Sequence, residues 1–166
     1  MAKQPQGQAG YYVTRELSDS LAFRSLPSAS KLLWHDLMGK YRGVNNGNIN
    51  SALSELKDYG WHSSTTIAKG LRHLIAHGFL IETREGGIRA GNLKKCCLYG
   101  FTHLPINDNS KLGIKGRVAT HDYRNYDPKK HAAESSLTLQ KMKRIAPHNG
   151  HKRPSSLQYM ELEICP

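Results

Sequence analysis

The sequence predicts an α+β fold with a three-helix core, a β-hairpin and an extended, largely irregular C-terminal tail. Three observations lead to this prediction. Apolar residues recur at helical spacing in three segments that end by residue 77. Two β-prone segments follow and enclose a Gly-rich stretch, which is typical of a hairpin. After about residue 107 the periodicity is lost, and the chain becomes polar, basic and Gly-bearing.

We expect one domain over residues 11–106, which is long enough to bury one modest core. A flexible lead rich in Gln, Gly and Ala precedes it over residues 1–10. A basic tail follows over residues 107–166, and we expect much of it to be flexible in isolation. Within the tail, a short helix is predicted at about 135–146 and a strand at about 157–164. Since a lone strand is not stable, it would pair with the domain or with the sheet edge of a partner protein.

A β-prone stretch over residues 11–14 opens the domain and leads into a short amphipathic segment. Its apolar positions are Leu17, Leu21, Phe23 and Leu26. Pro27 ends this segment, and a new helix can begin there with Ser28 as a plausible N-cap. The apolar stripe of this first core helix consists of Ala29, Leu33, Leu37 and Tyr41, with Trp34 and Met38 beside it.

A loop rich in Gly and Asn, residues 43–50, separates this helix from a short second one over residues 51–59. Asn50 or Ser51 is the expected N-cap of the second helix, and Gly60 is its expected end. Its inward-facing residues are Leu53 and Leu56, and Ile49 packs where the helix begins.

The third helix, residues 64–77, has Ser63 or Ser64 as its expected N-cap and Gly78 as its stop. Helical spacing places Ile67, Ala68, Leu71, Leu74 and Ile75 on one side. The opposite side carries Thr65, Thr66, Lys69, His73 and Ala76, with Arg72 at its margin. No acid occurs on this helix. Gly70 lies in its middle, where glycine costs about 1 kcal/mol relative to alanine, and a small residue there can permit close approach of another chain segment.

Residues 79–85 read as a strand, residues 86–92 as a flexible hairpin tip, and residues 95–103 as the returning strand. Cys97, Tyr99 and Phe101 alternate along the returning strand, so we expect them on one face.

The charge of the chain favours a polyanionic partner. The sequence holds 24 Lys and Arg against 13 Asp and Glu, which gives a formal net charge of +11. Residues 1–103 contain 13 basic and 7 acidic residues, and residues 104–166 contain 11 and 6. Both parts are therefore basic, and nucleic acid is the partner that this composition favours over an anionic membrane.

Three short motifs resemble a known group of proteins. They are Arg15-Glu16-Leu17, Phe23-Arg24-Ser25-Leu26 and Tyr41-Arg42-Gly43-Val44-Asn45-Asn46-Gly47. With the apolar helix between the last two, they are similar to the beginning of winged helix-turn-helix proteins encoded by plasmids, phages and integrative elements, both regulators and replication initiators. The resemblance covers roughly residues 11–106. It implies a helix-turn-helix at 51–77 and a wing at 84–95, but not which task the protein performs.

The resemblance implies that the third helix is a DNA recognition helix. Such a helix can read DNA because the major groove of a duplex is wide enough to admit it. Its expected contact residues are Ser64, Thr65, Thr66, Lys69, Arg72 and His73. Hydroxyls and cations of this kind bond phosphate oxygens and base edges, whereas acids would be repelled. Any surface helix shows some Thr, Lys and Arg; the lack of acids favours DNA contact.

The wing is expected to contact the DNA backbone or minor groove through Arg84, Arg89, Lys94 and Lys95, although a solvated hairpin is the alternative. Lys40 and Arg42 are interpreted differently. They follow the first core helix, where cations suit the negative end of the helix dipole.

We expect no metal, no cofactor and no catalytic residue. His73 and His77 have the helical spacing of zinc ligands, and Cys96 and Cys97 could add thiolates with His103 or Cys165. Adjacent strand residues point to opposite faces, however, so Cys97 is more simply a core residue. No phosphate-binding loop or nucleophile motif is present in the sequence, and Tyr123 and Tyr126 are interpreted as stacking or surface residues.

Three functions stay open. The first expectation is sequence-specific binding of double-stranded DNA by a transcriptional regulator of a mobile element or its host. The second is replication initiation or maintenance of such an element. The third is a docking module or inhibitor within a larger nucleoprotein complex. We expect a cytoplasmic, nucleoid-associated protein without a membrane partner; the cysteines form no disulfide framework and the apolar runs are too short to span a bilayer. The sequence does not indicate the oligomeric state.

Overall fold

The computed structural model describes residues 10–89 and 93–129. Three helices come first: α1 (Arg15–Asp19), α2 (Leu21–Ser25) and α3 (Ser28–Gly39). Thr14 caps α1 by accepting from the amide of Leu17, and Ser20 caps α2 in the same way. The expected β-prone start at 11–14 forms no strand, because its backbone finds no partner strand and its last residue serves as a helix cap instead.

The second helix is shorter than predicted and begins later. It consists of α4 (Leu53–Leu56) followed by a 3-10 turn, η1 (Lys57–Tyr59). Ala52 occupies the N-cap position, so neither Asn50 nor Ser51 caps it. Asn50 instead donates from its amide to Glu55 at 2.6 Å. Gly60 ends the turn with a φ of 88°, as predicted from its freedom to adopt left-handed backbone.

The helix α5 (Ser64–Ala76) matches its predicted range closely. Ser63 is the N-cap, and its hydroxyl accepts from the amide of Thr66. At the start of α3, Pro27 takes the N-cap position and Ser28 is already helical, which corrects the prediction for Ser28. Proline needs no amide partner there, so the helix can begin without a side-chain cap.

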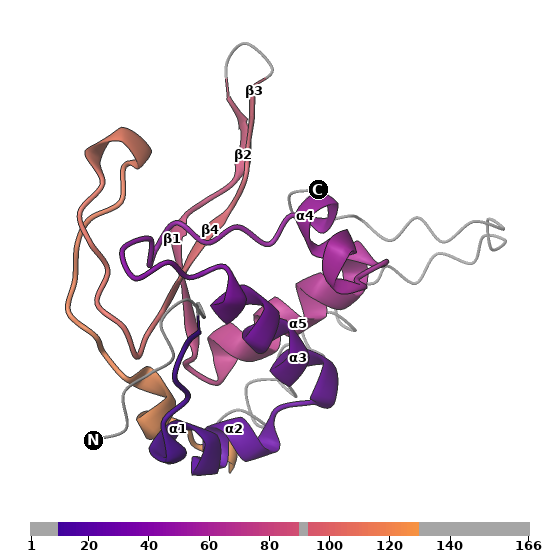
Figure 1. The fold of residues 1–166 in the computed structure, drawn as a ribbon, viewed down its shortest axis with the longest axis vertical. Coiled ribbons are helices and arrows are strands. Elements are labelled where there is room, and N and C mark those ends of the chain that lie inside the picture. Colours follow the sequence, from indigo (N-terminus) through magenta and orange to yellow (C-terminus); the bar gives the residue numbers. More distant parts are fainter. Residues whose placement is uncertain (1–9, 90–92, 130–166) are drawn as a thin grey trace, which may run out of the picture.

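Among the described residues, the strands form two antiparallel pairs. β1 (Leu80–Arg84) pairs with β4 (Leu98–Phe101), and β2 (Gly87–Arg89) pairs with β3 (Leu93–Lys95). The returning strand is thus interrupted between β3 and β4, and the pairing register shifts between Glu82 and Arg84. Figure 1 shows the β2–β3 pair projecting as an arm away from the helices. The chain before α4 joins the sheet of β1 and β4 through a bridge to β4, in which Ile49 and Tyr99 exchange two backbone hydrogen bonds.

The main core lies between the helices and one face of the sheet. Its largest fully buried side chains include Trp34, Leu33, Leu37, Leu56, Leu74, Phe79 and Phe101. Cys97 packs against this core and Tyr99 and Phe101 are buried in it, so the predicted face of the returning strand is confirmed. Leu98 points the other way into a smaller cluster with Ile106 and Ile114.

Helical spacing predicted most of the buried stripe, with three exceptions. Ile75, Leu21 and Ala29 are exposed. Ile75 lies in the last turn of α5 and is 41% exposed, and the buried residues of the segment that contains Leu21 are Ala22 and Leu26. Periodicity defines an apolar direction, but the width of the covering neighbour decides which residues are buried.

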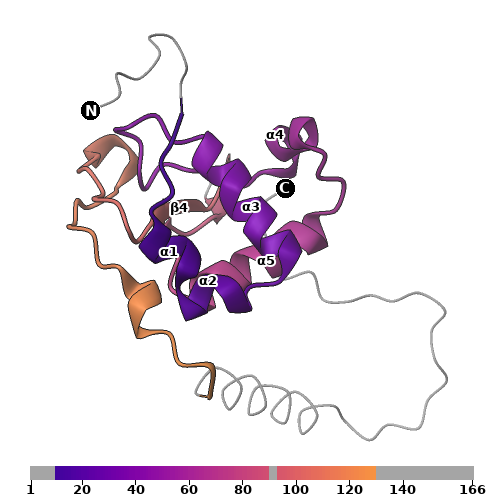
Figure 2. The ribbon, with the colours of Figure 1, turned by 60° about the horizontal axis from the view of Figure 1, so that its bottom comes forward.

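The helices α3 and α5 pack directly on each other, as both views show (Figures 1 and 2). Gly70 sits at this contact, where an added Cβ would lie 2.7 Å from Cδ2 of the fully buried Leu33. The glycine predicted to permit a close approach therefore does so toward a leucine side chain.

The packed part of the chain extends past the predicted domain end at residue 106. Tyr123, in the 3-10 turn η3 (Asp122–Asn125), is buried in the main core and stacks on Phe79 with ring centroids 5.4 Å apart. Tyr126 stacks on His77 at 4.3 Å. Residues 107–126 therefore pack against the predicted domain, beyond its expected end at 106, while their backbone is largely irregular, as expected, with two short 3-10 turns. The helix predicted at 135–146 and the strand predicted at 157–164 lie outside the described residues.

Candidate nucleic-acid interface

The turn that leads into α5 is anchored to α3 by one hydrogen bond. The indole Nε1 of Trp61, a residue only 6% exposed, donates to Oδ2 of Asp36 at 2.7 Å. Trp61 also donates its backbone amide to the carbonyl of Leu56 in the helix before the turn. Because an aromatic ring and a charge-assisted hydrogen bond hold the turn, the first residues of α5 have a fixed position relative to α3.

The outward side of α5 carries most of the predicted contact residues. Ser64, Thr65, Thr66, Lys69 and Arg72 are all exposed. Within the described residues, no ion pair engages Lys69 or Arg72. We call the group formed by Thr65, Thr66, Lys69 and Arg72 the acid-free face, since α5 contains no Asp or Glu. Two hydroxyls and two cations are therefore available to a ligand.

His73 does not lie with this group. It is half-buried, and its Nδ1 is 3.0 Å from the hydroxyl of the buried Ser30 on α3. Its ring therefore takes part in the contact between α3 and α5. The helical wheel placed His73 on the outer side because the wheel does not show that α3 extends around this edge of α5.

The segment after the sheet covers the opposite end of α5. Tyr126 stacks on His77, and a Cβ at Gly78 would lie 2.6 Å from the backbone carbonyl carbon of Asp122. Both contacts occur at or after the last turn of the helix. Within residues 10–89 and 93–129, the acid-free face near the N-terminus of α5 therefore remains exposed.

The four predicted hairpin cations differ in what the structure shows. Arg84 is half-buried and folds back, with Nη2 donating to the carbonyl of Cys96 at 3.0 Å, while its Nε is buried without a hydrogen-bond partner. Lys95 is half-buried at the end of β3. Arg89 ends β2 and Lys94 lies in β3, but only their backbone is described. Arg84 thus holds the base of the hairpin and does not project from it.

The two cations after α3 differ in their partners. Arg42 donates to the carbonyl of Gly39 at 3.1 Å, in agreement with the interpretation based on the helix dipole. Lys40 donates to the carbonyl and the side-chain oxygen of Asn50 and pairs with Glu55 at 2.6 Å. Hydrogen bonding to Lys40 lowers the pKa of the Glu55 carboxyl. Lys40 thus ties α3 to α4.

Several of the histidines and cysteines considered as metal ligands have other partners, and Cys165 lies outside the described residues. Nδ1 of His77 donates to the carbonyl of His73 at 2.8 Å, and its ring stacks on Tyr126. Cys96 and Cys97 are half-buried, and the Sγ of Cys97 accepts from the amide of Gly86. Across the described residues, no group of three or more His, Cys, Asp or Glu side chains could hold a metal ion.

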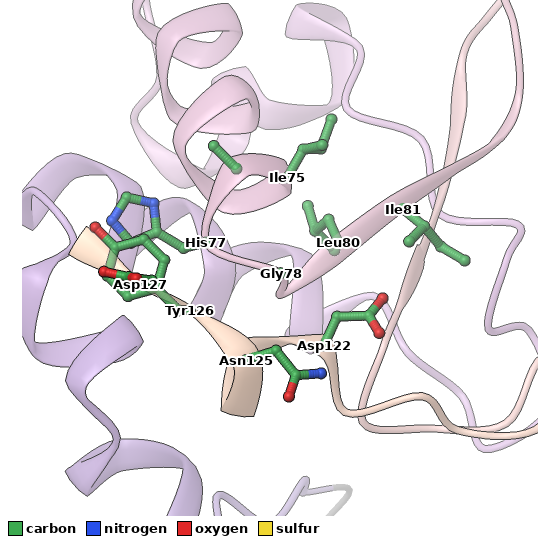
Figure 3. A pocket seen from close by; sticks show the side chains of 10 residues that line it. Ile75, His77, Gly78, Leu80, Ile81, Asp122, Asn125, Tyr126 and Asp127 are labelled. Carbon is green, nitrogen blue, oxygen red and sulfur yellow. The ribbon is translucent and has the colours of Figure 1, made fainter. Parts of the chain in front are cut away.

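A shallow hollow of about 320 Å³ lies beside the C-terminal end of α5 (Figure 3). Figure 3 shows the Asp122 side chain directed toward Ile81, with Tyr126 and Asp127 gathered near His77. The charged groups that line the hollow are Asp122 and Asp127, so it would repel phosphate. This end of the helix therefore differs from its N-terminal end in charge.

Sequence patterns missed the residues that position the candidate interface. Asp36 and Ser30 look like ordinary polar positions on α3, yet they hold Trp61 and His73. Asn46 is 3% exposed; its amide nitrogen lies within 3.1 Å of the carbonyls of residues 101, 104 and 105, and its oxygen accepts from the amide of Phe101. The Gly/Asn loop motif pointed to this position but not to its partners.

The fold is α+β, and α5 presents an exposed, cationic surface. Comparisons with known protein families, curated proteins and solved structures found no match. Within the described residues, no helix combines the length and the apolar character needed to cross a bilayer.

Proposed function

We propose that this chain is a winged helix-turn-helix protein that binds double-stranded DNA. In this proposal α3 is the supporting helix, α4 with η1 and α5 form the helix-turn-helix, and β2 with β3 form the wing. The element order supports the proposal, as does the bridge between Ile49 and Tyr99, which adds a third chain to the sheet of β1 and β4. The anchored turn at Trp61 is a further support.

The observation that carries the proposal is the acid-free face of α5. A duplex repels acids, and its major groove accepts a helix whose N-terminal half offers hydroxyls and cations. Thr65, Thr66 and Lys69 meet that requirement near the helix start, and Arg72 extends it by one turn. A bidentate contact from Arg72 to guanine would contribute about 1–3 kcal/mol of sequence discrimination.

The biological role that we propose is transcriptional regulation on a mobile element or its host chromosome, as the resemblance to winged helix proteins of such elements implies. Sequence-specific readout is the property this role requires. Selection of bound duplexes from a random pool would reveal a preferred site and its length. Recovery of no enriched sequence would exclude a sequence-specific regulator, although not backbone binding.

The DNA contact is tested by a Lys69→Ala/Arg72→Ala variant in a fluorescence anisotropy titration against the selected duplex. We expect affinity to fall at least tenfold. The slope of log affinity against log salt should decrease by up to about 1.8, because each lost phosphate contact contributes about 0.9.

An Arg24→Ala/Arg124→Ala variant is the matched control, since it removes the same charge from two exposed ion pairs elsewhere. Exposed pairs contribute little to stability, so the control should fold and bind with nearly full affinity. Equal affinity and equal salt slope in the α5 variant and the wild-type protein would refute the assignment of the contact face.

A further inference from the structure

A loop outside the predicted DNA contacts carries its own group of cations. Residues 106–117, here called the basic loop, contain Lys111, Lys115 and Arg117, all of them exposed. The loop includes the 3-10 turn η2 (Ser110–Leu112). Figure 1 shows it rising beside β1 and β4, on the side of these strands away from α5.

The basic loop has a defined backbone. Ile106 and Arg117 exchange two backbone hydrogen bonds of 2.8 and 2.9 Å, and Asn109 and Ile114 exchange two more of 2.9 and 3.0 Å. Near its end, the amide of Gly116 donates to the Asp108 carboxylate at 2.8 Å. The positions of the three cations are therefore set by a ladder of hydrogen bonds that closes the loop on itself.

Apolar residues fasten this loop to the sheet. Ile106 and Ile114 are 5% and 3% exposed, and they pack with Leu98 in the smaller cluster. Ile106 lies against Gly47 and Gly100, where an added Cβ would come within 2.8 Å of its side chain. The two glycines thus leave room for Ile106, which anchors the loop to the sheet. The cations of the loop are exposed to solvent.

Within the described part of the chain, no ion pair engages the cations of the loop. Among the described residues, the ion pairs join Arg24 to Asp19, Lys40 to Glu55 and Arg124 to Glu16, and none involves the loop. Asp108 is the acid within the loop, and it accepts from the loop backbone. Three positive charges that form no ion pair with any described residue, on a loop with a defined backbone, form a surface suited to a polyanion.

We propose that the basic loop binds the phosphate backbone of a DNA duplex as a second contact, separate from α5 and the β2–β3 hairpin. The inference rests on the proposed function. The loop offers Lys and Arg and no exposed aromatic ring for base stacking, so its contact is independent of sequence and serves to position the protein. The charge spread over a short fixed loop favours a backbone over an isolated acidic side chain.

The test uses the full chain with Lys111→Ala/Lys115→Ala/Arg117→Ala, measured by anisotropy on two duplexes. One duplex contains only the selected site, and the other extends it by one helical turn on each side. On the longer duplex we expect at least a tenfold loss of affinity. The loss should be equal on a duplex of the same length in which the selected site is scrambled. The salt slope should decrease by about 2.7, which is three contacts at about 0.9 each.

Two further variants guard against indirect effects. Arg24→Ala/Lys31→Ala/Arg124→Ala removes the same charge elsewhere and should leave the slope nearly unchanged. Lys111→Arg/Lys115→Arg/Arg117→Lys keeps the charge and should retain affinity. If the alanine variant lost affinity because the loop no longer folds, this variant should lose affinity as well.

The outcomes separate the two proposals. If the alanine variant keeps the affinity and salt slope of wild-type protein while Lys69→Ala/Arg72→Ala loses them, the basic loop inference is wrong and the proposed function stands. If wild-type protein binds no duplex, both are wrong. If the alanine variant binds duplex DNA as well as the wild-type protein does but no longer binds a polyglutamate probe, the inference is also wrong. The loop would then bind an acidic protein surface.

Discussion

The α3–α5 pair and the segment from 102 to 126 contribute to the same core in different ways. In the helix pair, whole stripes of apolar residues are buried together, and glycine at position 70 lets the two helices approach. The later segment contributes single side chains instead: Tyr123 stacks on Phe79, and Tyr126 stacks on His77. Periodic patterns reveal the first kind of packing. They do not reveal a residue that enters the core alone, because one apolar position in a polar stretch has no period.

The comparison is tested most strongly by Tyr123→Ala. If the segment is part of the core, this change removes a buried ring stacked on Phe79 and should destabilise the protein by about 3–5 kcal/mol. Denaturant unfolding would measure the change in the free energy of unfolding. Tyr12→Ala is the control, since Tyr12 is 74% exposed and its loss should cost little. A change below about 1 kcal/mol for Tyr123→Ala would return residues 107–126 to the status of a loose tail.

A pH titration of stability sharpens the comparison, because His103 lies in the later segment beside Trp34 of α3, with ring centroids 5.8 Å apart. Burial, with a smaller contribution from His121, lowers the pKa of His103 from 6.5 to about 4. Between these values the unfolded chain binds the proton and the folded chain does not. The free energy of unfolding should therefore decrease as pH falls from about 6.5 to about 4, by roughly 1–3 kcal/mol.

His103→Phe should keep the ring packing and remove this part of the pH dependence. The comparison is between the unfolding free energies of the two proteins at pH 7 and at pH 4.5. Parallel pH profiles for the variant and the wild-type protein would show that His103 titrates alike in the folded and unfolded states.

The smallest effect on stability is expected for Gly70→Ala, at the contact between α3 and α5. Alanine favours a helix by about 1 kcal/mol over glycine, but its Cβ would lie 2.7 Å from the buried Leu33 side chain, and overpacking costs about 1–3 kcal/mol. We expect a net loss of about 1 kcal/mol, measured by thermal unfolding. Gly39→Ala is a control with open space around its Cβ, and it should not lose stability in the same way. A clear gain for Gly70→Ala would mean that α3 can move away from α5.

Sequence reasoning predicted the elements that repeat and missed the contacts that do not. The range of α5, its Ser63 cap and the buried Ile67, Leu71 and Leu74 follow from spacing and cap chemistry. The outward placement of His73 was wrong, and the hydrogen bond from Arg84 to the carbonyl of Cys96 was not predicted. A helical wheel and a strand pattern give directions relative to one element, whereas Ser30 and the carbonyl of Cys96 belong to other segments.

The candidate interface shows the same division. Thr65, Thr66 and Lys69 were predicted to face outward and Arg72 to lie at the margin of the apolar stripe, because helical geometry suffices to place them, and all four are exposed. The cations of the basic loop escaped notice because no pattern marks residues 106–117 as an ordered element. Their order depends on Gly47 and Gly100, which lie far away in the sequence.

The side chain of Asn46 has a consequence for which substitutions the chain can accept. Aspartate has nearly the same shape, but it would turn an anion toward three carbonyl oxygens. Leucine would fill the space but could neither donate to those carbonyls nor accept from the Phe101 amide. Both the connection leading to α4 and the chain leaving β4 depend on this one primary amide, so position 46 should be among the least replaceable in the protein, although it lies in a loop.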